Sequence, residues 1–178
     1  MPTVVELGPG QTARGARAML ELRPHVGSAA DLVRLIDEVQ RPQGYRLLGS
    51  FDDAADPAHT AAADATAADA TEAAAVAGFV VGDKLAWGRH IYIDDLVTRP
   101  EHRGRGHAKA LLDWVAAEAR RLGCAQVHLD SATFRHDAHR RYLTAGYRIT
   151  SFHFVADGFV GDGFVGQGEA RPAQDGAG

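Results

Sequence analysis

The stretch that decides the fold is Leu96–Leu112, with the sequence LVTRPEHRGRGHAKALL. A short apolar run ends at Pro100, and a basic turn containing Gly104 and Gly106 leads directly into a segment with the apolar spacing of an amphipathic helix. The first N–H groups of a helix have no partner within it, and the helix dipole places partial positive charge there. A strand, a glycine turn and a helix start therefore predict a site for an anion such as a phosphate.

The spacing of this turn narrows the type of phosphate loop. It is neither a GxxxxGK[ST] loop nor a GxGxxG dinucleotide fingerprint, because Lys109 stands where the third glycine would be. The pattern [RQ]-x-x-G-x-[GA] does match, through Arg103, Gly106 and Ala108. With an apolar strand before it, and a long helix and the apolar run 125–129 after it, the loop resembles motif A of the GNAT superfamily of acyl-CoA-dependent N-acyltransferases. The alternative is an ordinary helix start with a solvated basic face.

A second motif, AHRRYLTAGY at Ala138–Tyr147, resembles the A-x-x-[FL]-Y-x-x-x-G-[FY] element of the same superfamily. The residues themselves predict a short helix that ends at Gly146 in the left-handed conformation, and then a strand over Tyr147–Val155. The resemblance implies that Tyr142 is the general acid that protonates the departing CoA thiolate. The alternative is a half-buried helix aromatic with its hydroxyl at the surface.

The resemblance also implies acetyl-CoA as co-substrate, with its pyrophosphate on the loop amides and positive charge from the basic side chains of the loop. A main-chain N–H at the end of the preceding strand would bind the thioester oxyanion. The implied cofactor contacts are Leu96, Val97, Thr98, Arg103, Gly104, Arg105, Gly106, His107, Ala108 and Lys109. No metal is expected, because no four-ligand set completes the histidines at 102, 107, 136, 139 and 153.

Two adjacent carboxylates, Asp94 and Asp95, interrupt the apolar strand predicted over Ile91–Val97. Alternation would send their side chains to opposite faces unless a β-bulge intervenes. Acidic residues at these offsets in GNAT relatives orient or deprotonate the substrate amine. The resemblance therefore implies that one of the two is a base or holds a water and the other anchors the ammonium group, in either order.

Other roles for this region stay open on the sequence alone. In one alternative, a carboxylate of the pair caps a neighbouring loop or forms an ion pair with Arg89 or Arg99. His90 and His128 are alternative bases, because a neutral imidazole accepts a proton near pH 7.

Composition limits the class of protein. Of 178 residues, 46% are hydrophobic and 24% are charged, which is typical of a globular domain. The net charge of −4 argues against a general nucleic-acid binder. The single cysteine, Cys124, excludes an intrachain disulfide, and no run of 18 apolar residues or signal-peptide pattern occurs. We expect a cytoplasmic protein, with no nucleic acid or membrane among its partners, that is a monomer or a homodimer.

The order of predicted elements is β-α-α-β-β-β-loop-α-β-α-β, which is the GNAT order. The fold class expected is α+β in three α/β layers, a mixed and mostly antiparallel central sheet flanked by about four helices. One domain is expected over residues 1–156. An alanine-rich hairpin insertion over 52–76 and a glycine-rich tail over 157–178 are expected to be mobile or disordered by composition.

The expected function is N-acetyl transfer from acetyl-CoA to an amine of a small molecule or protein by direct attack. The acidic pair favours a cationic amine as substrate. The substrate cleft is expected beside the first two predicted helices, near Arg23 and His25, with Trp87 and Tyr92 as further walls. The alternatives are a non-catalytic acyl-CoA-binding regulatory module and a transferase for longer acyl groups.

Overall fold

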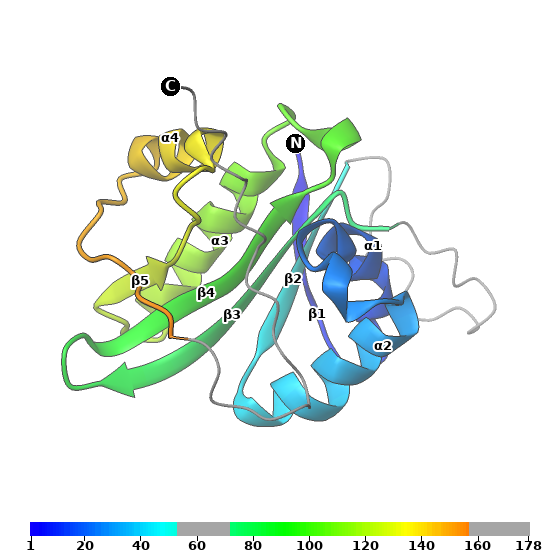
Figure 1. Ribbon diagram of the computed structural model, residues 1–178, viewed down its shortest axis with the longest axis horizontal. Coiled ribbons are helices and arrows are strands. Elements are labelled where there is room, and N and C mark those ends of the chain that lie inside the picture. The colour runs from blue at the N-terminus through cyan, green and yellow to red at the C-terminus, as the bar shows by residue number, and fades with distance from the viewer. Residues whose placement is uncertain (53–71, 157–178) are drawn as a thin grey trace, which may run out of the picture. The chain divides into compact units, whose positions relative to one another are not determined.

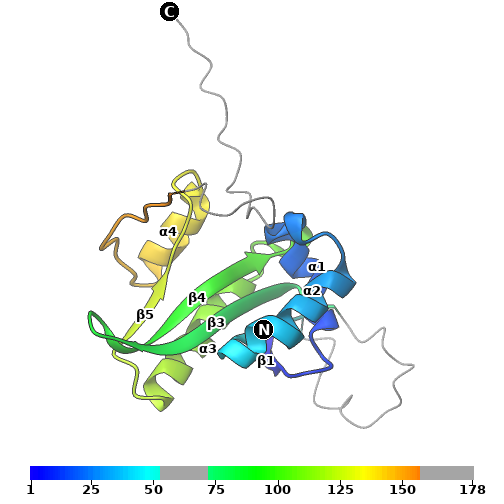
Figure 2. The same cartoon turned by 60° about the horizontal axis from the view of Figure 1, so that its bottom comes forward.

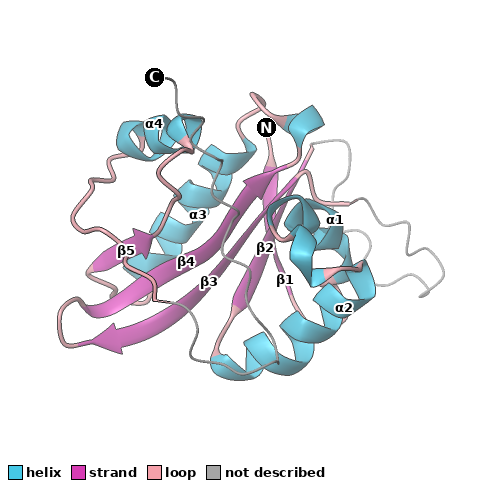
Figure 3. Cartoon of the chain, viewed as in Figure 1, coloured by secondary structure: helices cyan, strands magenta, loops and turns pink. Residues whose placement is uncertain are grey.

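The computed structural model describes residues 1–52 and 72–156 (Figure 1). The chain divides into two units, Met1–Arg148 and Ile149–Gly178. All helices and strands of the described residues lie in the first unit (Figure 3).

The first unit is built on a sheet with the strand order β1-β2-β3-β4-β5. Neighbouring strands are antiparallel except β4 and β5, which are parallel. The strands are β1 (Thr3–Leu7), β2 (Arg46–Phe51), β3 (Ala75–Lys84), β4 (Gly88–Thr98) and β5 (Gln126–Leu129). The longer helices are α1 (Ala13–Leu22), α2 (Ala29–Arg34), α3 (His107–Arg121) and α4 (His136–Thr144). Short turns of other helical types are η1 (Pro24–Val26), η2 (Leu35–Gln40), η3 (Arg41–Gln43) and η5 (Pro100–His102). The sheet and helices confirm the predicted fold class.

Local sequence signals explain where the helices begin and end. Ser28 caps α2, because its hydroxyl accepts a hydrogen bond from the Asp31 backbone N–H at 3.1 Å. Gly44 follows the last helical turn of this segment with φ +93°, and Gly146 follows α4 with φ +88°. Both glycines adopt the left-handed conformation that other residues rarely occupy, and the one after α4 is as predicted.

The helices form layers on the two faces of the sheet. Helices α1 and α2 lie on one face and α3 lies on the other (Figures 1 and 2). Side chains alternate between the two resulting cores: Leu47 packs with the α1 and α2 residues, whereas its neighbour Leu48 packs with those of α3. Both faces of the central strands are therefore buried, as the continuous apolar runs in their sequence indicate.

A β-bulge interrupts this alternation in the middle of β4. Gly78 of β3 is opposite Asp95 and the next residue, Phe79, is opposite Ile93, so Asp94 is the extra residue. Ile93 and Leu96 consequently pack in the same core although they are three residues apart. The bulge therefore shifts the end of β4 by one residue, at the place where the acidic pair lies.

The pairing between β4 and β5 is short. It joins His90–Ile93 to Gln126–Leu129, whereas β4 continues to Thr98. Among the described residues, the edge of β4 from Asp94 onward has no strand partner on the β5 side. This open edge is followed directly by η5 and the glycine loop.

Two sequence predictions need correction. Residues 147–156 form no strand, so the strand predicted over Tyr147–Val155 is wrong; this segment makes none of the ladder hydrogen bonds that define one, and Phe152 and Phe154 are exposed. The alanine-rich insertion ends earlier than predicted, because Ala73 and Ala74 are buried and β3 begins at the following residue. Small alanine side chains suit this closely packed position. The rest of the insertion, 53–71, and the tail, 157–178, lie outside the described residues.

Candidate active site

The carboxylate of Asp95 is held from two sides. Arg23, just after α1, donates from Nε to Oδ1 at 2.8 Å, and the Tyr45 hydroxyl donates to Oδ2 at 2.7 Å. Only 12% of the Asp95 side chain is exposed. Charge-assisted hydrogen bonds of this length fix the orientation of a carboxylate. The second carboxylate of the predicted pair is therefore already neutralised by a cation of the same chain.

Tyr45 reaches Asp95 by passing over a glycine. A Cβ atom added to Gly78 would lie 1.6 Å from the Tyr45 hydroxyl, so only glycine fits beneath the ring. The ring is buried, and burial followed by the charge of Asp95 raises the pKa of Tyr45 well above its ordinary value. Tyr45 therefore keeps its proton and remains a hydrogen-bond donor.

Asp94, the bulge residue, is the exposed member of the pair. Partial desolvation of its carboxyl and then the nearby charge of Asp95 raise its pKa to about 6, whereas Arg23 and Lys84 act in the opposite direction. Arg23 also donates from Nη2 to the Asp94 carbonyl oxygen at 3.1 Å and so clamps the bulged backbone. Arg23 thus contacts the carboxylate of Asp95 and the main chain of Asp94, so it holds both residues at the bulge.

An aromatic wall extends from the acidic pair toward the β3–β4 hairpin. The Trp87 ring stacks on His128 with centroids 3.8 Å apart and is nearly parallel to Tyr92 at 6.4 Å. The Lys84 ammonium lies over the Trp87 ring, 4.5 Å from its centroid. The Tyr92 hydroxyl donates to Asp130. The Lys84 ammonium thus already makes a cation–π contact with these rings, and a cationic group beside them could do the same.

The two alternative bases are tied into this wall. His90 is buried, and its Nδ1 lies 2.9 Å from the Gly88 carbonyl oxygen. The Nε2 atom of His128 lies 2.7 Å from Gln126 Oε1, and burial lowers the pKa of His128. Both imidazoles thus have structural partners, whereas Asp94 is exposed.

The glycine loop leads into α3, as the sequence predicts. Gly104 and Gly106 have φ values of +77° and +92°, and residues 103–106 are exposed. Arg103 donates weakly to the Thr98 carbonyl oxygen at 3.4 Å, and Lys109 forms an exposed ion pair with Asp113. The loop therefore presents backbone N–H groups at the start of α3, with cationic side chains around them.

His107, one of the predicted cofactor contacts, points its side chain away from this surface. The imidazole is buried, with Nδ1 2.9 Å from the Ser50 hydroxyl and Nε2 3.2 Å from Asp52 Oδ1. Burial lowers the pKa of His107 and so favours the neutral ring. Only the main chain of His107 is left for an anion on the loop. Sequence reasoning missed Ser50 and Asp52, which no local pattern connects to the loop.

Tyr142 lies on α4 and packs against the core on the α3 side of the sheet. Its ring centroid is 6.0 Å from that of Tyr147. Burial raises the pKa of Tyr142, and Arg135 and Arg141 oppose this effect less strongly. The hydroxyl therefore retains its proton at neutral pH, which a general acid requires.

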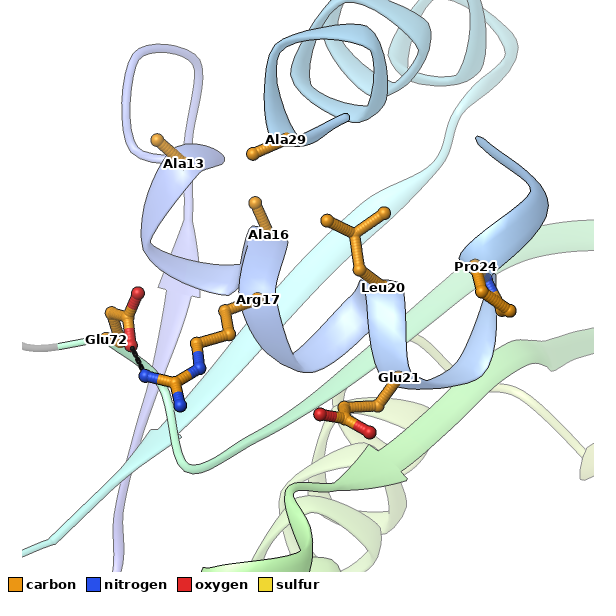
Figure 4. Close-up of a pocket in the computed structure, with 8 residues that line it drawn as sticks. All are labelled: Ala13, Ala16, Arg17, Leu20, Glu21, Pro24, Ala29 and Glu72. Carbon is orange, nitrogen blue, oxygen red and sulfur yellow. Dashed lines mark hydrogen bonds and ion pairs between the residues drawn. The ribbon is translucent and has the colours of Figure 1, made fainter. Parts of the chain in front are cut away.

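A shallow pocket lies elsewhere, along α1 and the start of α2. Figure 4 shows its lining, with Leu20 and the Arg17–Glu72 ion pair among the side chains drawn. None of the residues predicted for catalysis or cofactor binding lines it. It is therefore distinct from the surface formed by the acidic pair, the open β4 edge and the glycine loop.

Comparison with known proteins decides the family. The sequence profile of the acetyltransferase (GNAT) family matches residues 30–147. The chain belongs to this family. The matched range includes the bulged strand, the glycine loop and the Tyr142 helix, and the predicted GNAT resemblance of the chain is confirmed. Acetyl-CoA is the co-substrate of GNAT acetyltransferases.

Two curated proteins named as N-acetyltransferases match part of this chain. The chain is 43% identical over 68 residues to the uncharacterized N-acetyltransferase YhdJ of Bacillus subtilis (strain 168), covering 38% of this chain and 48% of that protein. It is 40% identical over 63 residues to the aminoalkylphosphonate N-acetyltransferase of Salmonella typhimurium (strain LT2), covering 35% and 41%. The aligned region thus spans less than half the length of either relative.

A solved structure shows that the fold is shared over most of the chain. The crystal structure of ribosomal-protein-alanine N-acetyltransferase from Brucella melitensis biovar Abortus 2308 superposes with a TM-score of 0.67. The superposition covers 88% of this chain and 99% of that one at 16% identity. Among the described residues, no helix is both long and apolar enough to cross a membrane.

Proposed function

We propose that this GNAT protein is an N-acetyltransferase that moves the acetyl group of acetyl-CoA to an amine by direct attack. The observation that carries the proposal is the continuity of three features along one stretch of chain. The bulge exposes Asp94, the β4 edge beyond it lacks a partner on the β5 side, and the glycine loop follows. Along the chain, a carboxylate that would receive the amine is followed by main-chain donors for the thioester and then by an anion site for the pyrophosphate.

The residues at the loop fit the CoA pyrophosphate. Both loop glycines have backbone angles that favour glycine, and a Cβ added at Gly104 would meet no atom within 4 Å. The free N–H groups at the start of α3 would donate hydrogen bonds to the phosphate oxygens, and Arg103, Arg105 and Lys109 would supply positive charge. On the open edge, main-chain groups of Leu96, Val97 and Thr98 would hold the thioester arm, with an N–H available to the oxyanion.

The chemistry needs one proton removed and one supplied. The amine nitrogen attacks the thioester carbonyl carbon, the C–N bond forms, and the C–S bond breaks as the tetrahedral intermediate collapses. We assign Asp94 as the base that takes the amine proton, directly or through water, because a pKa of about 6 leaves it ionised at pH 7. We assign Tyr142 as the general acid that donates a proton to the leaving thiolate.

Asp95 has a different proposed part. Its carboxylate is neutralised by Arg23 and hydrogen-bonded to Tyr45, so it is a positioning residue that fixes the bulge rather than a free anchor for ammonium. The acceptor's positive charge would instead be met by ionised Asp94 and the aromatic wall of Trp87 and Tyr92. We therefore propose a cationic amine acceptor. We further propose that the acetyltransferase domain spans residues 1–156 and acts in the cytoplasm.

The test combines acetyl-CoA titration calorimetry with a free-thiol release assay over a panel of amines. The panel contains a polyamine, free lysine, an aminoglycoside, an aminoalkylphosphonate and a neutral aromatic amine. We expect saturable binding and thiol release that is fastest with a cationic acceptor. Binding without turnover on any amine would support the non-catalytic acyl-CoA-binding module instead. Absence of acetyl-CoA binding would overturn the loop assignment.

A further inference from the structure

Three potential metal ligands converge beneath the glycine loop. Asp52 follows β2, His102 ends η5, and His107 opens α3. One ligand atom from each lies within 4.8 Å of the other two. His102 and His107 flank the loop in the sequence, but Asp52 is separated from them by 50 and 55 residues. Only the folded chain brings the carboxylate to the two imidazoles.

The distances within this cluster suit a shared ion. His102 Nδ1 lies 3.0 Å from Asp52 Oδ2, and His107 Nε2 lies 3.2 Å from Asp52 Oδ1. Two ligands of a tetrahedral ion with bonds of about 2.0 Å are separated by roughly 3.3 Å. Each imidazole nitrogen therefore lies at about this separation from one oxygen of the Asp52 carboxylate, and the ligand atoms of all three residues lie within 4.8 Å of one another.

Ser50 orients the buried ligand. Its hydroxyl lies 2.9 Å from His107 Nδ1, and both side chains are buried. A hydroxyl can donate or accept, so it can take the Nδ1–H bond and leave Nε2 free to bind a metal. Metal-binding histidines usually have such a partner on the other ring nitrogen, because it fixes the ring and its tautomer.

Solvent reaches the cluster from one side. The Asp52 side chain is 44% exposed and that of His102 is 21% exposed, whereas the His107 side chain is fully buried. Among the residues that the structure describes, Arg105 is a charged group that faces the cluster, and its guanidinium lies 3.6 Å from Asp52. Its side chain is 57% exposed and can move into solvent when a cation takes its place. Solvent therefore has access to the cluster at Asp52 and His102.

We propose that Asp52, His102 and His107 form a site for one divalent ion of the zinc class, with three protein ligands and water in the fourth position. Nitrogen and carboxylate donors in this number match the ligand preference of Zn²⁺. The ion would join the end of β2, η5 and the first turn of α3, and so fix the residues on both sides of the glycine loop. This metal-site proposal does not depend on the proposed acetyltransferase activity.

Cobalt(II) titration of the metal-free, untagged full-length protein tests the proposal directly. Co²⁺ replaces Zn²⁺ in such sites and is coloured. We expect saturation at one equivalent, the intense visible absorption of a four-coordinate ion, and loss of this absorption when Zn²⁺ is added. Zn²⁺ should also raise the Tm in the absence of acetyl-CoA and of any amine, so this result is independent of the proposed enzyme activity.

Two ligand variants and one matched control make the test specific. Asp52→Asn and His102→Ala should each weaken Zn²⁺ binding by at least about a hundredfold. Removing a residue that hydrogen-bonds to a metal ligand weakens binding by about 10- to 100-fold, and removing the ligand itself should have a larger effect. His136→Ala removes an exposed histidine from α4 and should leave binding unchanged. Circular dichroism of each metal-free variant verifies its folding. Weak binding without defined stoichiometry, or equal affinity in wild type and in the folded His102→Ala variant, would overturn the site.

Discussion

Arg23 Nε lies 2.8 Å from Asp95 Oδ1, and this ion pair joins the end of α1 to the bulge of β4. The same guanidinium reaches the Asp94 carbonyl oxygen through Nη2. The Arg23 side chain therefore neutralises the Asp95 carboxylate and holds the Asp94 backbone, and its charge opposes the rise in the pKa of Asp94. Replacing Arg23 should therefore change the pKa of Asp94 although Asp94 itself is not mutated.

Arg23→Ala should move the acidic limb of the kcat/KM profile to higher pH. The limb is expected near pH 6, the pKa of Asp94, and loss of the cation removes an interaction that lowers this pKa. Arg23→Lys keeps the charge and serves as control, with a limb closer to that of the wild type. The measurement is the pH dependence of thiol release, and an identical limb in wild type and Arg23→Ala would contradict the coupling.

Asp94→Asn should lower kcat/KM by about 10²- to 10⁴-fold and abolish the limb near pH 6, because the amide cannot take a proton. Retention of the limb would place the base elsewhere, with His90 and His128 as the next candidates.

The same Asp94→Asn substitution should stabilise the fold at pH 8. The pKa of Asp94 is raised in the folded state from 3.8 to about 6, so the folded protein binds the proton more tightly than the unfolded chain does. The contribution of Asp94 to stability is therefore largest below pH 3.8 and is lost as the pH rises through about 6. Thermal melts should show a higher Tm for the variant at pH 8 and no difference near pH 3.5.

Tyr142→Phe should reduce kcat by about 10²-fold while leaving the Kd for acetyl-CoA nearly unchanged, because only the proton for the thiolate is lost. Tyr147→Phe removes the neighbouring hydroxyl, whose pKa burial raises to about 12, and is the matched control. Thiol release and calorimetry measure the two quantities. Equal turnover of wild type and Tyr142→Phe would remove the general-acid role.

Gly106→Glu should abolish acetyl-CoA binding, since it puts a carboxylate and a Cβ atom where the pyrophosphate would approach the backbone. Gly106 has φ +92°, so the substitution also strains the backbone. Gly123→Glu introduces the same charge at another left-handed glycine, after the far end of α3, and should bind acetyl-CoA normally. Calorimetry on both variants separates the local effect from the strain; a similar loss in both would argue against the loop.

Gly78→Ala should destabilise the protein by about 1–3 kcal/mol, the usual range for overpacking a core. The new Cβ would overlap the Tyr45 hydroxyl and push it from Asp95. Gly82→Ala on the same strand is the control, because its Cβ would make only an ordinary contact with His90 at 3.5 Å. Urea denaturation measures the difference, and equal stabilities of the two variants would show that Tyr45 relocates without cost.

The sequence by itself determined those features that depend on neighbours along the chain. The helix end at Gly146 and the period of apolar residues are local features, so pattern and spacing were sufficient to predict them. The same local patterns carried the family resemblance. The strand expected over 147–155 failed because apolar alternation shows only that a segment is able to pair, whereas a strand exists only where a partner accepts its hydrogen bonds.

Only the tertiary structure decided which residues of the candidate site contact one another. The partners of Asp95 are 72 and 50 residues away in the chain, and Asp52 is 50 residues from His102. Such contacts arise from sheet register and helix packing, to which each local segment contributes only part. The bulge that turns Asp94 out and leaves Asp95 against Arg23 is a property of the β3–β4 pairing. The sequence therefore supplied the chemical groups, and the fold determined which of them is free to react.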